Sequence, residues 1–532
     1  MKFRGLALGA AIGGTALLAV LAQPAGAVTV NYANQGDLKS LDPYTLNETT
    51  TIAHHAHVYE GLIRRDQNLK VQPALAESWE LVEPNRWRFH LRKGVKFSDG
   101  TPFTADDVLF SAERVRAPGS NFATRLPPDA KVTKVDDFTV DFTTDKPNPI
   151  LFNAWDSWYI MSKKWAEEHN SVAPTPAAAT TPTYASLHAM GTGPFTIESH
   201  QPGVKTVFKK NPNYWRKVDG NIDEIVFTPI ANDSTRVSAL LSGEVDIVEP
   251  VPLQDIDRVK SSGAAQVLNA PEIRVVFLGM DQARDELVNS NVKGKNPFKD
   301  RRVREAFFKA IDVDVIKSRV MRNLSSPTPL MVARELFDLS GEFTREKSDP
   351  AAAKKLLVEA GYPNGFEVGI NCPSDRYVND GDICRAIISM LARIGVKVNP
   401  IIEPKAQYFA KILKSGGYNT SFYMLGWTAS TMDSHNVLYE IMGCRNDPKS
   451  SRGDTNVGGY CNPKLDELAD KVQVETDRAK RDQMIKQAFQ LCIDDYCYIP
   501  LHQQPLSWGV SKKLKIQQRA DNQVRFEWAV KE

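Results

Sequence analysis

Three histidines close together in the sequence, His54, His55 and His57, are the first residues that could bind a metal ion. If residues 51–62 form a helix, neighbouring side chains diverge by about 100°, so only the first and third histidines share a face. Two histidines at that spacing are a weak indication of a metal site. We therefore expect the three side chains to be exposed to solvent or to lie beside a ligand cleft.

Catalytic motifs are absent from the sequence. It contains no G-x-S-x-G elbow, no G-x-x-x-x-G-K-[S/T] phosphate loop, no H-E-x-x-H pair and no G-x-G-x-x-G after a strand. Gly191 and Gly193 form a lone G-x-G, but Pro194 follows them directly, so this stretch predicts a turn. The absence of these motifs favours binding over catalysis.

The first 27 residues have the pattern of a cleavable signal peptide. A basic start, residues 1–4, precedes an apolar stretch, residues 5–22, and Ala25-Gly-Ala27 supplies the small residues that a signal peptidase recognises. An uncleaved membrane anchor is the alternative, but the many glycines and alanines make a weak membrane span. No cysteine precedes Cys372, so there is no lipobox. We predict a soluble, periplasmic protein.

An exported protein can form disulfides, and all six cysteines lie beyond residue 370. Their spacing suggests three neighbouring pairs: Cys372 with Cys384, Cys444 with Cys461, and Cys492 with Cys497. We predict disulfides for the first two pairs, whereas the third could equally be two buried thiols at a helix end. No Cys-x-x-Cys or clustered Cys/His spacing supports a zinc site, and we predict no cofactor.

The composition is that of an ordinary globular protein, with 532 residues of which 42% are hydrophobic and 24% are charged. At roughly 150 residues per domain, the length predicts two to four domains. Lysine and arginine total 66 against 64 acidic residues, and two of the cations, Lys2 and Arg4, belong to the predicted signal peptide. The mature chain is therefore neutral, without the electrostatic footprint of a nucleic-acid-binding protein.

Short strands alternate with helices along the chain, a pattern typical of α/β architecture. Residues 366–371 predict a strand, the apolar periodicity up to Gly395 predicts a helix, and residues 396–402 predict a second strand. This stretch therefore reads as a βαβ unit in a parallel or mixed sheet. Asp349 and Gly361 mark the start and the end of the preceding helix.

The first half of the chain gives three further local predictions. Residues 87–91 alternate between apolar and polar side chains and predict a half-buried strand. Thr104-Ala-Asp-Asp107 is a capping sequence that predicts the start of a helix. Residues 172–184, rich in proline, alanine and threonine, predict an exposed, mobile loop or linker.

A set of short stretches follows one another in a characteristic order. They are Ser40-Leu-Asp-Pro43, Val58-Tyr-Glu-Gly-Leu62, Pro73-Ala-Leu-Ala-Glu-Ser-Trp79, FHLRKGVKFSDGTPF at residues 89–103, Gly191-Thr-Gly-Pro-Phe195, Lys210-Asn-Pro-Asn-Tyr-Trp215, Leu241-Ser-Gly-Glu-Val-Asp246, Asp300-Arg-Arg-Val-Arg-Glu-Ala306 and residues 418–427. This ordered set covers essentially the whole mature chain. It resembles the extracytoplasmic solute-binding proteins of ABC importers, in the dipeptide/oligopeptide/nickel-binding class known as solute-binding family 5.

The resemblance implies an α/β, two-lobed periplasmic binding protein, type II-like, which closes on its ligand at a hinge. It also implies an additional subdomain in the N-terminal lobe. By that pattern, the chain divides into a first lobe of residues 28–72, 190–282 and 503–532, an extra subdomain of residues 73–189, and a second lobe of residues 283–502. All six cysteines then lie in the second lobe.

The resemblance also implies a ligand site at Arg376 and its neighbour Tyr377. Both follow the predicted strand at residues 366–371, and ligands of open α/β sheets commonly bind at the C-terminal ends of strands. In dipeptide-binding members an arginine in a similar P-x-x-R context binds the ligand carboxylate, and Arg376 matches it. A surface or structural ion pair with Asp375 or Asp380 is the alternative.

A second candidate is the loop after the predicted buried strand that ends at Gly426, where the resemblance places Trp427 and Thr428 in the cleft. Peptide binders have an aspartate four residues after this glycine, which pairs with the peptide ammonium. That position is Ser430 here, and a neutral hydroxyl cannot supply a charge-assisted bond. This departure argues against ordinary peptides. Asp433 could take over the role, or could merely cap the following helix.

Nickel-chelate binders of the family carry an Asp-Pro-His sequence near this point, and this chain has Asp433-Ser-His435. The His435 imidazole could contact a chelated metal or a ligand carboxylate, form a polar part of the cleft wall, or have no role. Tyr44 and Asn47, with Trp427, complete a plausible cleft wall, although the aromatic residues could equally belong to the core.

Together these expectations describe the periplasmic substrate-binding component of an ABC import system. It is a monomer that captures a peptide-like or other small polar solute by hinge closure and delivers it to permease subunits in the inner membrane. We expect no enzymatic activity. The alternatives are a metal-chelate or haem receptor of the same fold, a secreted hydrolase, and a chemoreceptor partner that binds solute without supporting uptake.

Overall fold

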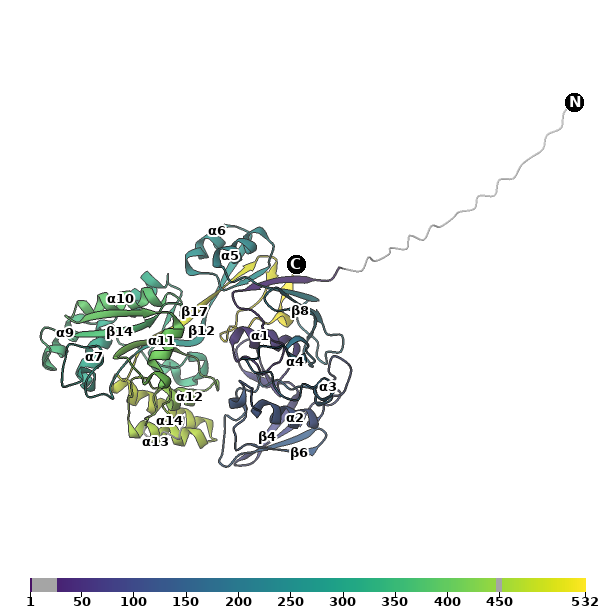
Figure 1. Cartoon of the computed structure of the whole chain (residues 1–532), viewed down its shortest axis with the longest axis horizontal. Coiled ribbons are helices and arrows are strands. Elements are labelled where there is room, and N and C mark those ends of the chain that lie inside the picture. Colours follow the sequence, from purple (N-terminus) through teal and green to yellow (C-terminus); the bar gives the residue numbers. More distant parts are fainter. Residues whose placement is uncertain (2–25, 446–451) are drawn as a thin grey trace.

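The computed structural model describes residues 1, 26–445 and 452–532. Two lobes lie side by side and are connected by the long strands β12 (Ala265–Met280) and β17 (Ile499–Ser511) (Figure 1). Residues 2–25 of the predicted signal peptide lie outside the described ranges. Within those ranges, no helix combines the length and the apolar character needed to cross a membrane.

The largest sheet of the described residues has eleven strands and runs through both lobes. β12 and β17 pair antiparallel in its interior. On one side follow β16 (Phe422–Trp427), β14 (Glu367–Pro373) and β15 (Lys397–Glu403); on the other follow β11 (Ile247–Glu249), β1 (Thr29–Asn34), β10 (Glu224–Pro229), β9 (Lys205–Lys210) and β8 (Phe195–Gln201), while β13 (Ser326–Pro327) pairs with β17. We call the half with β1 and β8–β11 lobe I and the half with β14–β16 lobe II. The α/β class is confirmed.

The connecting strands change register between the lobes. The N-terminal half of β12 pairs with the C-terminal half of β17, the pairing is interrupted between Pro271 and Val275, and the rest of β12 also pairs with β16. Glu272, Ile273 and Arg274 fall in this interruption. Irregularities of this kind twist a strand and re-aim its side chains, and all three residues line cavities between the lobes.

The predicted βαβ unit of lobe II is confirmed. β14 and β15 are parallel neighbours, and α10 (Asp380–Ala392), with Ile387 and Leu391 buried, connects them. The preceding helix, α9 (Pro350–Glu359), begins as expected, because the carboxylate of Asp349 accepts a hydrogen bond from the backbone N–H of Ala352 (2.9 Å). Gly361, just past its end, has a φ of 90°, a conformation that favours glycine.

The other helices of the described residues are distributed over both lobes (Figure 1). Lobe I, together with the segment that leads into β12, contains α1 (Thr49–Val58), α2 (Ala105–Arg116), α3 (Lys163–Glu168), α4 (Tyr184–Leu187), α5 (Asp233–Ser242) and α6 (Ile256–Ser261). Lobe II contains α7 (Arg301–Ala310), α8 (Val313–Val315), α11 (Lys405–Ile412), α12 (Ser434–Asn436), α13 (Pro463–Val474) and α14 (Arg478–Asp494).

A second, antiparallel sheet lies at the far end of lobe I, in the strand order β4-β5-β7-β6. Its strands are β4 (Ala76–Glu83), β5 (Arg86–Leu91), β6 (Lys131–Asp136) and β7 (Thr139–Thr143); short pairs form between β2 (Ile63–Arg65) and β3 (Val71–Pro73) and between β18 (Leu514–Lys515) and β19 (Val530–Lys531). β5 confirms the strand expected at residues 87–91. The predicted cap of α2 also forms, since the Asp107 carboxylate accepts from the N–H of Thr104 (2.9 Å).

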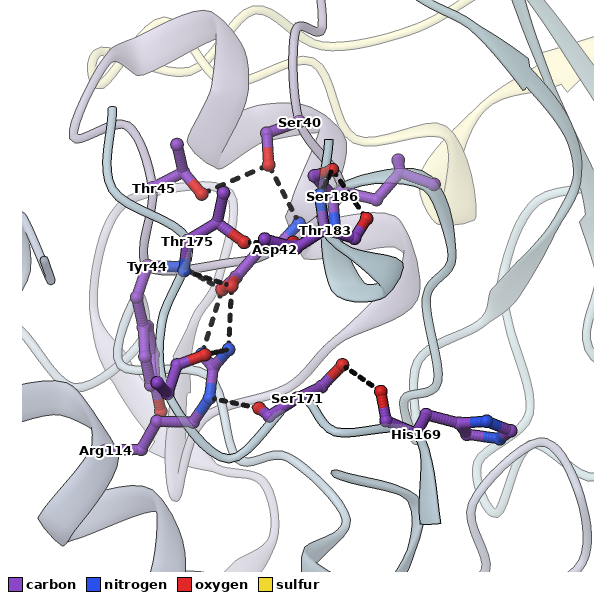
Figure 2. Close-up of polar contacts among 12 residues, drawn as sticks. Ser40, Asp42, Tyr44, Thr45, Arg114, His169, Ser171, Thr175, Thr183 and Ser186 are labelled. Carbon is purple, nitrogen blue, oxygen red and sulfur yellow. Dashed lines mark hydrogen bonds and ion pairs between the residues drawn. The ribbon is translucent and has the colours of Figure 1, made fainter. Parts of the chain in front are cut away.

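A buried ion pair connects α2 to the start of lobe I (Figure 2). The Arg114 guanidinium donates to both carboxylate oxygens of Asp42, at 2.9 and 2.7 Å, and both side chains are fully buried. Asp42 also accepts from the backbone N–H groups of Tyr44 (3.1 Å) and Thr175 (2.8 Å). Burial alone would raise the pKa of Asp42, but Arg114 and these N–H groups hold it below its ordinary value.

The same ion pair explains the path of residues 172–184. This segment has no regular structure up to Thr183, as predicted. It is not exposed throughout, however, because Thr175 is 4% exposed and the carbonyl of Ala173 accepts from Arg114 (3.1 Å). The expectation of a wholly exposed linker is wrong, since part of the segment supplies polar groups to a buried charge.

The three histidines of α1 are buried, so the expectation of solvent exposure is wrong. His54, His55 and His57 are each at most 2% exposed. The ring centre of His54 lies 4.2 Å from that of Phe227, within the aromatic core of lobe I. Burial lowers the pKa values of the three to about 3, 4 and 4, so the rings are neutral. Across the described residues, no group of three or more potential ligands could hold a metal ion.

All three cysteine pairs are joined in lobe II. The disulfides are Cys372–Cys384, Cys444–Cys461 and Cys492–Cys497. The first connects β14 to α10, with the two Cα atoms 6.5 Å apart. The structure thus joins the two predicted pairs and also the third pair, for which the sequence left two possibilities open.

Candidate ligand-binding cleft

Three adjoining cavities form one cleft between and beside the lobes. The first, of about 620 Å³, and the second, of about 270 Å³, are lined by residues of both lobes. The third, of about 420 Å³, lies against lobe II. Arg274 lines all three, and Arg376 and Thr428 each line two. Cavities of this size, with a few polar groups on their walls, suit small-molecule ligands.

Arg376 and Tyr377 lie in the turn between β14 and α10 and line the first and third cavities. The Asp380 carboxylate accepts from the backbone N–H groups of Arg376 (2.9 Å) and Tyr377 (3.0 Å), which fixes the turn. Among the described residues, no carboxylate lies within 4.0 Å of the Arg376 guanidinium, so the alternative ion pair with Asp375 or Asp380 is not formed. Although the side chain is exposed, partial desolvation by the surrounding protein lowers the pKa of Arg376, with a smaller contribution from Arg274.

Tyr377 also connects this turn to β16. Its hydroxyl accepts from the backbone N–H of Gly426 (2.8 Å). The ring packs so closely on the glycine that a Cβ at this position would lie 2.6 Å from a ring carbon. This contact places the Arg376 turn beside the loop that follows Gly426.

That loop supplies Trp427, Thr428 and Ser430 to the cleft. The Trp427 indole N–H donates to the Asn436 side chain (2.7 Å), which holds the ring in the wall of the third cavity. The Thr428 hydroxyl is buried without a hydrogen-bond partner. Because buried polar groups are normally paired, this hydroxyl is available to a ligand. Ser430 lines the second cavity.

Asp433 lies outside these three cavities. Its carboxylate oxygens accept from the Arg481 guanidinium at 2.6 and 2.8 Å, and one of them also accepts from the N–H of His435 (2.8 Å) at the start of α12. Both oxygens are thus used within lobe II. The structure matches the alternative that Asp433 caps the following helix and does not bring it to the cleft.

His435 is likewise absent from the walls of the three cavities. Its side chain is buried, and its ring centre lies 5.4 Å from that of Tyr439. Burial lowers the pKa of His435 to about 4, so the imidazole is neutral near pH 7. The structure therefore places this histidine in the packing of lobe II rather than beside a ligand.

The two residues of lobe I that were predicted to line the cleft lie in different surroundings. Asn47 lines the second cavity, and its side-chain oxygen accepts from the Arg125 guanidinium (3.3 Å). Tyr44 is instead fully buried, and its hydroxyl donates to the carbonyl of Tyr159 (2.6 Å). The expectation that Tyr44 lines the cleft is therefore wrong, because its ring packs in the core beside Arg114.

Arg274 is the central residue of the cleft and was not predicted. It lies in the interruption of β12, its closest carboxylate contact is with Glu272 (3.4 Å), and its Nε is buried without a partner. The available signal was a charged residue inside the apolar stretch Ile273-Arg-Val-Val-Phe277. A cation in such a stretch is a candidate for a functional role because buried charges are costly.

Arg125 was also missed. It is 7% exposed and lines the second cavity. Its guanidinium donates to the Ser157 hydroxyl (3.0 Å) and to the Asn47 side chain (3.3 Å). Burial lowers the pKa of Arg125, against the attraction of Asp156. No pattern in the sequence around this arginine distinguishes it from a surface residue.

Glu249 contributes a carboxyl group to the first cavity, close to the hinge strands. Its oxygens accept from the Tyr32 hydroxyl (3.1 Å) and from the Asn522 side chain (3.0 Å). Burial raises the pKa of Glu249 to about 7, and the neighbouring Glu272 acts in the same direction. The group is therefore partly protonated at neutral pH.

Comparisons with known proteins fit this geometry. A family model described as bacterial extracellular solute-binding proteins, family 5 Middle, matches residues 70–449. Heme-binding protein A of Haemophilus influenzae is 28% identical over 479 residues, which cover 85% of this chain and 83% of that protein. Glutathione-binding protein GsiB of Escherichia coli O1:K1 / APEC is 26% identical over 507 residues, 94% of this chain and 93% of that protein. The ABC transporter substrate binding protein CtaP from Listeria monocytogenes shares the fold, with a TM-score of 0.81 at 18% identity over 95% of this chain and 99% of that chain.

Proposed function

Because the chain belongs to the bacterial extracellular solute-binding proteins of family 5, we propose that it is the periplasmic substrate-binding component of an ABC importer. It captures a peptide-like or other small polar solute. The observation that carries this proposal is the cleft of about 620 Å³, to which both lobes and the connecting strands contribute walls. Proteins of this family bind solutes, so the chain is not an enzyme and the hydrolase alternative falls away.

Capture works by closure of the two lobes. β12 and β17 connect them (Figure 1), and the pairing of these strands is interrupted between Pro271 and Val275. We infer that the strands bend near this interruption and that the bending moves the loop after β16 toward lobe I. A ligand shifts the balance to the closed form only through contacts that the open form lacks. Residues of both lobes on one cavity wall supply such contacts. The closed form is then recognised by permease subunits in the inner membrane.

Within the cleft, we assign Arg376 to a carboxylate of the solute, because its guanidinium carries no ion pair and can form two parallel hydrogen bonds. The remaining wall residues divide by chemistry into aromatic surfaces, Tyr377 and Trp427, and hydrogen-bonding groups, Thr428, Ser430 and Asn47. We assign no ligand contact to Asp433, His435 or Tyr44.

The domain division follows from the same proposal. Residues 1–27 are a signal peptide removed on export to the periplasm, and the mature protein is a monomer. Its parts are a first lobe of residues 28–72, 190–282 and 503–532, an extra subdomain of residues 73–189, and a second lobe of residues 283–502. The chain passes between the lobes within β12 and β17, which both lobes share.

A haem receptor is the second candidate, supported by the similarity to heme-binding protein A. Haem has a strong visible absorption band, so mixing ligand-free protein with haemin separates the two candidates. The proposed function predicts no spectral shift at stoichiometric haemin. A metal-chelate role through His435 has lost its support, because that side chain does not line the cleft.

Closure on a natural solute tests the function directly. The chain is unfolded in guanidinium chloride without reductant, refolded without ligand, and mixed with the small-molecule extract of its own cells. Small-angle X-ray scattering should show a smaller radius of gyration with the extract than without it. Unchanged scattering, together with the absence of a retained solute in native mass spectrometry, contradicts the proposed function.

A further inference from the structure

Guanidinium groups from three separate parts of the chain face the same cleft. Arg125 comes from lobe I, Arg274 from the connecting strand β12, and Arg376 from lobe II. Arg274 shares the second cavity with Arg125 and the first and third cavities with Arg376. The three cations therefore lie along one continuous path across the cleft.

Two of these cations form no ion pair within the part of the chain that the structure describes, and Asp156 acts on Arg125 only at longer range. Among the described residues, neither Arg125 nor Arg376 has a carboxylate within 4.0 Å. The nearest hydrogen-bond partners of the Arg125 guanidinium are the neutral side chains of Ser157 and Asn47. A buried charge is normally paired, because an uncharged partner does not return the full cost of removing the charge from water. Arg125, which is 7% exposed, is such a buried cation on the lobe I wall. Arg376 is exposed on the lobe II wall, and its unpaired guanidinium is open to a ligand anion from that side.

The acidic residues of the cleft are not equally available. Three of them pair with arginines that do not line the cavities, namely Asp156 with Arg65 (3.6 Å), Asp521 with Arg519 (2.6 Å) and Asp233 with Arg236. Glu272 contacts Arg274, Asp375 accepts from the backbone N–H of Lys405, and Glu249 is partly protonated at neutral pH. In the cavity that Ser430 lines, Asp521 is therefore occupied by Arg519, whereas Asp156 lies at ion-pair distance from Arg65 without a hydrogen bond.

We propose that the cleft selects a solute with two carboxylates, one bound by Arg125 of lobe I and the other by Arg376 of lobe II, with Arg274 between them. This inference rests on the proposed function and narrows its solute class. Charge-assisted, two-point contacts with guanidinium groups provide both energy and geometric selection. The hydroxyl of Thr428, buried without a partner, supplies a neutral hydrogen bond beside them.

The same arrangement makes closure depend on the charge of the ligand. Closing the lobes brings Arg125 toward Arg274 and Arg376, and like charges repel more strongly as water leaves the cleft. A solute with two carboxylates neutralises this repulsion, whereas a neutral solute or a single carboxylate leaves part of it. The protein therefore discriminates against uncharged solutes of the same shape through an unfavourable contact as well as through lost attraction.

The experiment counts the carboxylates of the captured solute. Ligand-free protein is mixed with the small-molecule extract of its own cells, and the solute is released and treated with acidic methanol, which adds one methyl group per carboxylate. The proposal expects at least two added methyl groups. A captured solute with one carboxylate or none overturns it while leaving the proposed function intact, whereas capture of no solute contradicts the proposed function itself.

Variants then locate the two carboxylates. Arg125→Gln and Arg376→Gln should each weaken calorimetric binding of the free solute about ten- to hundredfold. Each monomethyl ester of the solute should be insensitive to one of the two substitutions and sensitive to the other. Arg385→Gln on α10, which removes an exposed arginine paired with Asp382, should change no affinity by more than about twofold. Parental affinity in both cleft variants, with unchanged melting temperatures, overturns the proposal.

Discussion

Glu249→Gln should stabilise the folded protein above neutral pH. The Glu249 side chain is 5% exposed, and burial raises its pKa from 4.5 to about 7. The folded state thus binds the proton more tightly than the unfolded state does. This contribution to stability is fully present below about pH 4.5 and is lost as the pH rises through about 7. Glutamine carries no charge at any of these values, so its contribution does not change with pH.

The size of the effect follows from the shift. A rise from 4.5 to about 7 corresponds to about 3 kcal/mol, at 1.36 kcal/mol for each pKa unit. Glutamine also has nearly the size and shape of a protonated glutamate, and its carbonyl can accept from the Tyr32 hydroxyl or from the Asn522 side chain. The free energy of unfolding of the variant, relative to the parent, should therefore increase by about 2–3 kcal/mol between pH 5 and pH 8.

Urea-induced unfolding of ligand-free protein, followed by tryptophan fluorescence at several pH values, measures this difference. Glu244→Gln, at an exposed glutamate outside the cleft, is the matched control and should give a difference that does not vary with pH. If Glu249→Gln also gives a constant difference, the buried carboxyl is not the proton-binding group and the reasoning fails.

Three further predictions concern stability and packing. Asp42→Asn leaves its fully buried arginine partner without a counter-ion and should cost about 3–5 kcal/mol of unfolding free energy; calorimetric unfolding within about 1 kcal/mol of the parent contradicts the role of this pair. Cys444 and Cys461, which are 17 residues apart, should appear as one linked peptide in non-reducing mapping, and replacing both with serine should cost about 3 kcal/mol; free thiols in exported protein rule the bridge out. Gly426→Ala places a methyl group against the Tyr377 ring and should lower the free energy of unfolding in denaturant by about 1–3 kcal/mol. It should also weaken solute binding in calorimetry. If neither the unfolding free energy nor the affinity changes, the ring moves freely and the contact does not position the turn.

Local features of lobe II could be predicted because several independent signals agree there. Asp349 caps α9, Gly361 follows its end with a positive φ, and apolar periodicity marks α10 between two parallel strands. Arg376 could be located for the same reason, since it directly follows a strand of this unit. Capping, periodicity and strand ends depend only on neighbouring residues, so one sequence is sufficient to identify them.

The rest of the cleft depends on contacts between distant segments. Arg125 and Thr428 line one cavity although they are 303 positions apart in the sequence, and no local pattern indicates that they lie near each other. His54 and His55 show the same limit for burial, because α1 is enclosed on all sides and its polar residues follow no amphipathic pattern. The role of Asp433 depends in the same way on Arg481, which is 48 positions away in the sequence and occupies its carboxylate.

The shared strands also set the order in which the molecule can assemble. β17 follows every other strand of the large sheet in the sequence, yet it lies between β11 of lobe I and β12. A chain synthesised from its N-terminus can form the second sheet of lobe I and the βαβ unit of lobe II early, since both rely on contacts between neighbouring segments. The cleft must wait for β17, and pairings over such long sequence distances form slowly. Before β17 pairs, β12, which carries Arg274, lacks its neighbour in the sheet. The two lobes are then incomplete, and no ligand cleft exists between them.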